Sequence, residues 1–144
     1  MNTPLVKEYT YDVPVENVWN ALTEKEQMKI WYFPQLKEFE PSVGFEFQFD
    51  DDSAEYQKEW VVTKCEVGKT LGHSWAYKGF FGKSEVTFEL SPEQNKTKLK
   101  VTQTGLDSFP SHPHFNRARF ELGWENLLGR NLKNLLEKNN LSPE

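Results

Sequence analysis

A chain of 144 residues with 37% hydrophobic and 15% aromatic side chains is large enough for one domain with a real core. Its formal net charge of −5 argues against non-specific binding to nucleic acid, which requires clustered lysines and arginines that the sequence does not have. No apolar run approaches the roughly 20 residues of a membrane-spanning helix, and the first residues show no signal-peptide pattern. The single cysteine, Cys65, excludes an internal disulfide, and we expect it to be a buried, inert thiol. These features predict one soluble domain, residues 1–144, in the cytoplasm.

The first part of the chain predicts one strand and two short helices. Residues 5–11 alternate and are rich in tyrosine, valine and threonine, which is typical of a strand. Pro14 stands at a favourable first position for a short helix whose apolar residues follow at i, i+3, i+4 and i+7. Thr23 and Glu26 have the spacing of a capping box for a second helix, which Pro34 ends.

Alternating apolar residues predict about six antiparallel strands, most of them in the middle of the chain. A turn at residues 41–44 precedes Phe45, Phe47 and Phe49, which alternate with polar residues and indicate a half-buried strand. Further strands are expected at about residues 56–67, 71–77, 84–90 and 97–106. The inward-facing residues of the last three are expected to be Leu71, His73, Trp75 and Tyr77, then Ser84, Val86, Phe88 and Leu90, then Leu99, Val101 and Gln103.

Residues 116–138 predict a long C-terminal helix, because they contain no proline and their apolar residues recur at helical spacing. Leu122 points away from the apolar stripe, and the helix would be roughly 35 Å long. A helix of this length needs a sheet to lie on, so we expect an α+β fold with a strongly curved antiparallel sheet wrapped around it. Such a sheet leaves a wedge of space beside the helix. The stripe consists of Phe120, Trp124, Leu127, Leu128, Leu132 and Leu135.

The loops at one end of this wedge are expected to close its mouth. Two prolines exclude regular structure from residues 107–115, which contain Phe109 and Phe115. Phe80 and Phe81 occupy a predicted hairpin tip and could lie at the same mouth.

Several short motifs occur in an ordered combination. They are residues 18–23 (VWNALT) followed by Trp31, residues 41–47 (PSVGFEF), residues 71–75, 86–90 and 97–99, and residues 123–124 (GW). With them, nearly the whole chain resembles activator of heat-shock protein 90 ATPase homologue-like domains, of the START-like or polyketide-cyclase-like (SRPBCC) superfamily. The resemblance implies a helix-grip fold with six to seven strands in the curved sheet. It also implies an interior pocket for hydrophobic or amphipathic molecules, but not one activity.

Two departures from the family pattern bear on function. The eukaryotic chaperone activator carries an additional N-terminal domain with an asparagine- and tryptophan-rich motif, which this sequence lacks. We therefore do not expect direct stimulation of a chaperone ATPase. The family commonly has an aromatic or aliphatic residue near His73 and a histidine near Gln103, so the resemblance implies a pocket with its own polarity.

The inward faces of the strands and of the long helix predict a pocket of aromatic and polar side chains. Because buried polar groups are unfavourable unless paired, His73 and Gln103 could hydrogen-bond a ligand. Arg117, near the helix start, could meet a ligand carboxylate or phosphate. Alternatively, Arg117 and Glu121 form an i,i+4 ion pair on the exposed first turns of the helix. The candidate ligand-binding residues are Phe47, His73, Trp75, Phe88, Gln103, Arg117, Phe120, Glu121 and Trp124.

The sequence predicts no catalytic residue, metal ion or cofactor. A metal site needs three or four converging ligands, whereas His112 and His114 offer two in a loop. The acidic run at residues 50–52 lacks the spaced ligands of a calcium loop and is interpreted as a solvated hairpin tip. No serine or cysteine has the setting of an activated nucleophile.

Three functions remain open. The favoured one is a domain that binds a hydrophobic or amphipathic small molecule as a carrier or sensor, because aromatic residues outnumber catalytic candidates on the inward faces. The second is a cyclase or hydrolase that uses His73 or Glu121 as a general base. The third is a chaperone-regulating protein-interaction domain, with a role in the stress response. We expect a monomer or weak homodimer that binds no nucleic acid and does not span a membrane.

Overall fold

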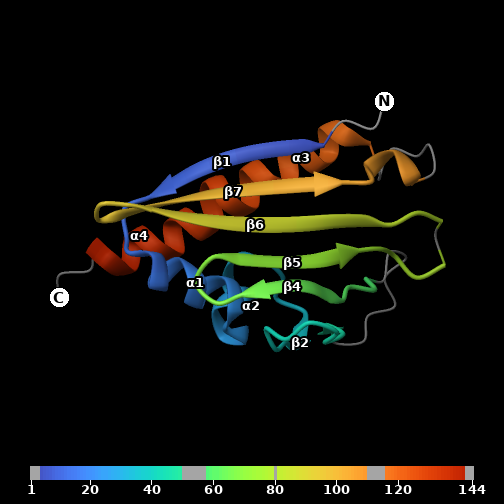
Figure 1. Cartoon of the computed structure of the whole chain (residues 1–144), viewed down its shortest axis with the longest axis horizontal. Coiled ribbons are helices and arrows are strands. Elements are labelled where there is room, and N and C mark those ends of the chain that lie inside the picture. Colours follow the sequence, from blue (N-terminus) through green and yellow to red (C-terminus); the bar gives the residue numbers. More distant parts are fainter. Residues whose placement is uncertain (1–3, 50–57, 80, 110–115, 142–144) are drawn as a thin grey trace.

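The structure is a computed structural model and describes residues 4–49, 58–79, 81–109 and 116–141 (Figure 1). Two short helices follow the first strand, and a long helix ends the chain, as the sequence predicts. In chain order the elements are β1 (Leu5–Tyr11), α1 (Val15–Thr23), α2 (Lys25–Trp31), β2 (Leu36–Glu38), β3 (Gln48–Phe49), β4 (Val62–Glu66), β5 (Thr70–Trp75), β6 (Ser84–Glu93), β7 (Lys96–Thr104), a 3-10 turn (Leu106–Ser108), α3 (Arg117–Asn126), a π-helical segment (Leu127–Leu132) and α4 (Lys133–Leu141).

Five strands form one antiparallel sheet in the order β1-β7-β6-β5-β4, and β2 pairs with β3 in a second, two-stranded sheet. The long helix of α3 and α4 lies along one face of the large sheet, and α1 and α2 cover the end near β4 and β5 (Figure 1). The register places Leu71 opposite Phe88, and Phe88 opposite Val101, so these three buried side chains form a row beneath the helix. This architecture confirms the predicted α+β helix-grip fold.

In β6 and β7, the alternation of apolar and polar residues in the sequence correctly predicts which side chains are buried. Val86, Phe88, Leu99, Val101 and the polar Gln103 are all buried, as predicted. Alternation predicts well here because both strands pair on both edges, so that one face meets the helix and the other meets solvent.

The predicted strand at residues 45–49 is broken up in the structure. Only Gln48–Phe49 pairs with β2, while Phe47 N donates to Trp60 O and Val62 N donates to Phe45 O, each at 2.9 Å. The segment therefore changes partner along its length and joins the small sheet to the start of β4. This shared pairing divides the predicted single sheet into sheets of five and two strands.

The predicted capping box at Thr23 is wrong. Thr23 lies in the last turn of α1, and its hydroxyl donates back to Trp19 O at 2.8 Å. Glu24 alone separates the two helices and is the N-cap of α2, without a side-chain capping bond. The chain leaves no room for Thr23 to stand outside a helix, as capping requires.

Cys65 is half-exposed rather than buried. The pairing of β4 with β5 shifts between Val62 and Lys64, which disrupts the alternation on which the prediction rests. Partial burial raises the pKa of the Cys65 thiol above its usual value.

The long helix contains a π-helical segment that displaces the predicted apolar stripe. Phe120, Trp124, Leu128, Leu132 and Leu136 are buried, whereas Leu127 and Leu135 are half-buried. A π turn holds more residues than an α turn, so the inward position moves along the sequence. As predicted, Leu122 points away, with 62% of its surface exposed.

The end of the domain near the start of α3 is only partly described. A 3-10 turn occupies Leu106–Ser108, where the sequence predicts no regular structure, and Phe109 after it is buried. Phe81 is 81% exposed. Phe80, His112, His114, Phe115 and residues 50–52 lie outside the described residues. No helix in the described part of the chain is both long and apolar enough to cross a membrane.

Candidate functional site

A pocket of about 180 Å³ opens between β5, the residues after α2 and the first half of the long helix. Its walls are largely aromatic, and its polar side chains are one tyrosine and one arginine. The lining residues are Phe33, Trp75, Tyr77, Arg119, Phe120, Gly123, Trp124 and Leu127.

On the sheet side, Trp75 and Tyr77 form the wall of the pocket. They point the same way because side chains two apart on a strand share a face, and a bridge between Lys58 and Tyr77 continues the pairing beyond β5. Trp75 Nε1 donates to the Tyr77 hydroxyl at 2.8 Å, which fixes the two rings relative to each other. Trp75 also meets Phe120 and Trp124 edge-on, with centroid separations of 5.7 Å in each case.

On the helix side, the pocket is lined at helical spacing by Arg119, Gly123 and Leu127, and by Phe120 and Trp124 beside them. Gly123 has a particular role, because a Cβ built on it would meet no atom within 4 Å. A larger side chain at this position would project into open space. Gly123 therefore keeps this part of the wall open.

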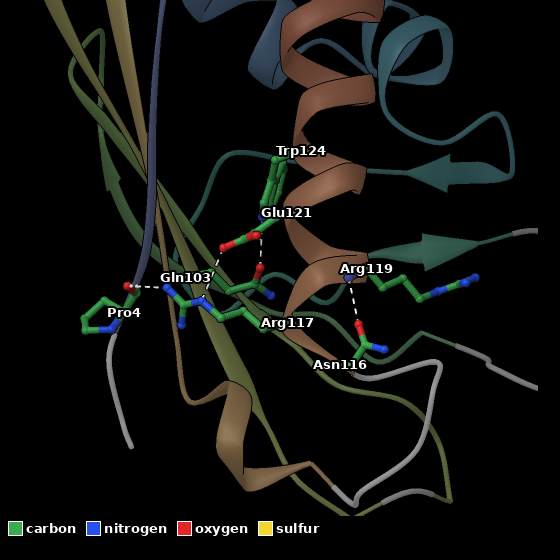
Figure 2. A network of polar contacts seen from close by, with 7 residues as sticks. All are labelled: Pro4, Gln103, Asn116, Arg117, Arg119, Glu121 and Trp124. Carbon is green, nitrogen blue, oxygen red and sulfur yellow. Dashed lines mark hydrogen bonds and ion pairs between the residues drawn. The ribbon is translucent and has the colours of Figure 1, made fainter.

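The inner wall is anchored by a buried hydrogen bond, in which Trp124 Nε1 donates to Gln103 Oε1 at 2.9 Å (Figure 2). The amide nitrogen of Gln103 has no hydrogen-bond partner among the described residues, and neither has Trp60 Nε1. Both atoms are buried donors, and leaving such groups unpaired is unfavourable. Through its bond to Trp124, Gln103 orients the indole ring, although Gln103 itself does not line the pocket.

His73 lies in the core beside the pocket and is fully engaged. Its Nδ1 lies 2.8 Å from Ser74 O, which can only accept, so Nδ1 carries the proton; Nε2 then accepts from the Tyr32 hydroxyl at 2.9 Å. Burial lowers the pKa of His73 to about 4, although the Ser74 carbonyl and the charge of Glu85 act in the opposite direction. A neutral, enclosed imidazole with both nitrogens bonded is poorly placed to act as a general base.

Arg117 and Glu121 are exposed on the first turns of α3 and do not line the pocket. Arg117 Nε lies 3.3 Å from Glu121 Oε2, and Arg117 Nη2 donates to Pro4 O at 3.0 Å. Figure 2 shows this pair on the β1 side of the helix, whereas Arg119 extends away from it. The structure thus has the i,i+4 ion pair, one of the two alternatives from the sequence.

Arg119 occupies the position at the pocket that the sequence suggested for Arg117. Its backbone N–H donates to the capping Asn116 Oδ1 at 2.8 Å (Figure 2), and Arg119 is among the residues that line the pocket. Burial raises the pKa of Tyr77, while the Trp75 hydrogen bond and the nearby charge of Arg119 oppose the rise. The guanidinium therefore lies close enough to act on the hydroxyl of Tyr77.

Of the nine candidate residues, Trp75, Phe120 and Trp124 line the pocket. Phe47, His73, Phe88 and Gln103 are buried in the adjoining core, and Arg117 and Glu121 lie outside it. The lining residues absent from the candidate set are Phe33, Tyr77, Arg119, Gly123 and Leu127. Alternation with Trp75 pointed to Tyr77, and the helical stripe to Leu127, but no periodic signal pointed to Phe33.

Two further features of the described residues bear on the choice of site. They contain no cluster of three or more histidine, cysteine or acidic side chains that could hold a metal ion. A larger hollow of about 710 Å³ lies on the outer face of the sheet, around the turn between β4 and β5. Its charged side chains have both signs, and include Glu8, Glu89, Lys98 and Lys100. The pocket beneath the helix is the better-formed binding site, because it combines aromatic walls with few polar groups.

The comparisons with known proteins agree with this fold. The family described as Activator of Hsp90 ATPase homolog 1-like protein matches residues 12–137. Protein MLL2253 from Mesorhizobium loti is 27% identical and has a TM-score of 0.75, over 96% of this chain and 100% of its own.

Two other solved structures share the fold at lower identity. CalU16 from Micromonospora echinospora is 23% identical with a TM-score of 0.71, over 97% of this chain and 77% of its own. DynU16, from the dynemicin biosynthetic locus, is 22% identical with a TM-score of 0.75, over 96% of this chain and 49% of its own. No curated protein sequence matches the chain significantly. Because the family match spans most of its length, the chain belongs to the Activator of Hsp90 ATPase homolog 1-like protein family.

Proposed function

We propose that this protein binds a small hydrophobic or amphipathic molecule in the pocket beneath the long helix, as a carrier or sensor. The observation that carries the proposal is the aromatic pocket itself, held open at Gly123. Its volume of about 180 Å³ is slightly larger than the roughly 150 Å³ of a dry apolar cavity that accepts benzene. A ligand with one aromatic ring, or a comparable aliphatic group, would fit these walls.

Family membership supports a ligand-binding domain, and the description of one structural relative provides context. This relative, DynU16, is described as a protein of the dynemicin biosynthetic locus. The polar groups of the pocket, Tyr77 and Arg119, do not form an obvious acid–base or nucleophile pair. A binding role therefore accounts for the pocket more simply than catalysis.

The experiment is a titration with fluorobenzene followed by ¹⁹F NMR. Wild-type protein is expected to bind it at one site, and Gly123→Leu to weaken that binding by at least about tenfold, because the new side chain occupies the pocket. Thermal stability of this variant should not fall, since leucine is the better helix former.

Ala118→Leu is the matched control, because Ala118 is exposed on the same helix. It should bind fluorobenzene as wild type does. If fluorobenzene binds equally to wild type and Gly123→Leu, or does not bind wild type at all, the pocket is not the binding site and the proposal is wrong.

The name of the family keeps chaperone regulation as the second candidate. It predicts that the full chain changes the ATPase rate of purified Hsp90 at stoichiometric concentrations. An unchanged rate together with fluorobenzene binding would favour the small-molecule role.

A further inference from the structure

Tyr77 and Arg119 are the polar side chains that line the pocket, and the charge of Arg119 acts on the hydroxyl of Tyr77. The remaining lining residues carry aromatic or aliphatic side chains, or none in the case of Gly123. Arg119 is the one cationic side chain among these lining residues, and Lys58 Nζ lies 4.7 Å from the ring centroid of Phe33, which also lines the pocket. Arg119 is exposed, so water screens its charge and its attraction for an anion is modest.

Arg119 and Arg117 differ in their ion pairing among the described residues. None of the salt bridges among the described residues involves Arg119, whereas Arg117 pairs with Glu121 one turn along the helix. The sequence explains the difference, because the residue four positions after Arg119 is Gly123. The glycine that opens the pocket is therefore also the position where an ion-pair partner would stand.

We propose that the pocket selects compact aromatic carboxylates, with the ring against Trp75 and Trp124 and the carboxylate on Arg119. This inference rests on the proposed function and names its ligand class. A guanidinium is planar and suits two-point contact with a carboxylate. A volume of about 180 Å³ accommodates one ring with a short acidic substituent.

The test compares phenylacetate with phenylacetamide, which have the same shape and differ in charge. Binding to ¹⁵N-labelled protein is followed by NMR titration, with the Gly123 amide as a reporter inside the pocket. Wild type should bind phenylacetate about fivefold more tightly than the amide, a modest preference because Arg119 is exposed on one side. Raising the salt concentration should weaken binding of the carboxylate and leave that of the amide unchanged.

Variants at the two arginines assign the effect to one residue. Arg119→Gln should abolish the preference for phenylacetate and leave phenylacetamide affinity within about twofold of wild type. Arg119→Lys should retain part of the preference, since it keeps the charge without the planar fork. Arg117→Gln is the matched control, because Arg117 is two residues away and outside the pocket, and it should bind both compounds as wild type does.

The outcomes separate this inference from the proposed function. If Arg119→Gln binds phenylacetate as tightly as wild type, or Arg117→Gln loses as much affinity, Arg119 does not select the ligand. If wild type binds phenylacetamide and Gly123→Leu binds it more weakly, the pocket keeps its proposed function without selectivity for carboxylates. If neither compound binds wild type, both proposals fail.

Discussion

The space between the sheet and the long helix has two halves. Both are lined by aromatic side chains, but one is filled by them and the other contains the pocket. In the half beneath α2, Trp31 and Tyr32 stack with their centroids 4.3 Å apart, and the Tyr32 hydroxyl is bonded to His73. In the half beside β5, Trp75 faces the helix at Gly123, where no side chain completes the packing. Aromatic content therefore does not decide whether this fold has a solid core or a pocket. At Gly123, the absence of a side chain leaves open space in the wall of the pocket.

The polar groups of the two halves differ in the same way. In the closed half, His73 has partners for both ring nitrogens and is held neutral by burial. In the open half, Arg119 lines the pocket and forms no ion pair with an acidic side chain among the described residues. The hydrogen bonds of His73 stabilise one packing arrangement of the core, whereas Arg119 is available to a ligand.

The largest effect should come from Trp124, which forms a wall common to both halves. Trp124→Ala is expected to lower the free energy of unfolding by about 3–5 kcal/mol, as a large buried truncation does. Urea denaturation followed by circular dichroism measures the loss. Leu122→Ala is the control on the exposed face of the same helix and should change stability by less than about 0.5 kcal/mol. A loss below about 1 kcal/mol for Trp124→Ala would mean that this ring does not join the two halves.

Burial of His73 in the closed half should make stability depend on pH. Its pKa is about 4 in the folded protein and 6.5 in the unfolded chain, so between these values the unfolded state binds the additional proton. The contribution is complete above pH 6.5 and is lost as pH falls towards 4, by roughly 3 kcal/mol in total.

His73→Gln isolates that contribution. Glutamine can donate to Ser74 O and accept from Tyr32 without titrating. The difference between wild type and variant in urea unfolding should shrink as pH falls from 7 to 4. Parallel pH profiles for the two proteins would show that His73 does not take up a proton on unfolding in this range.

The sequence predicts the closed half better than the open one, for a physical reason. Alternation and helical spacing report which side chains leave water, so Phe88, Val101 and Trp124 were correctly expected to be buried. They do not report strand register or helix type. Cys65 and Leu127 therefore differ from expectation, the first beside a register shift and the second at the start of a π-helical segment.

The open half is harder to predict because a pocket depends on what does not fill it. Trp75 and Phe120 were found from their inward positions, but Gly123 has no side chain to add to a periodic pattern. Arg119 stands next to the apolar stripe and is chemically equivalent to Arg117 in the sequence. Only the structure shows that one of these arginines lies at the rim and the other pairs with Glu121.

Filling the open half slightly should stabilise the protein. Gly123→Ala is expected to raise the free energy of unfolding by about 0.5–1 kcal/mol, because alanine favours the helix and its Cβ meets open space. Gly129→Ala provides a comparison in the same helix, since its Cβ would lie 3.2 Å from Tyr9 Cε1 and from Glu125 Oε2. Thermal unfolding should show a smaller gain at Gly129. Equal gains in stability at both positions would mean that a Cβ meets no less hindrance at Gly123 than at Gly129.

The smallest effect should come from the ion pair that lies outside both halves. Arg117 and Glu121 have side-chain exposures of 43% and 48%, so water and salt screen their attraction. A double-mutant cycle with Arg117→Gln and Glu121→Gln should give a coupling of about 0.2–0.5 kcal/mol that declines at high salt. Arg117→Gln alone also removes the hydrogen bond to Pro4 O, so its loss can exceed the coupling. A coupling above about 1.5 kcal/mol would show that the pair is shielded from solvent.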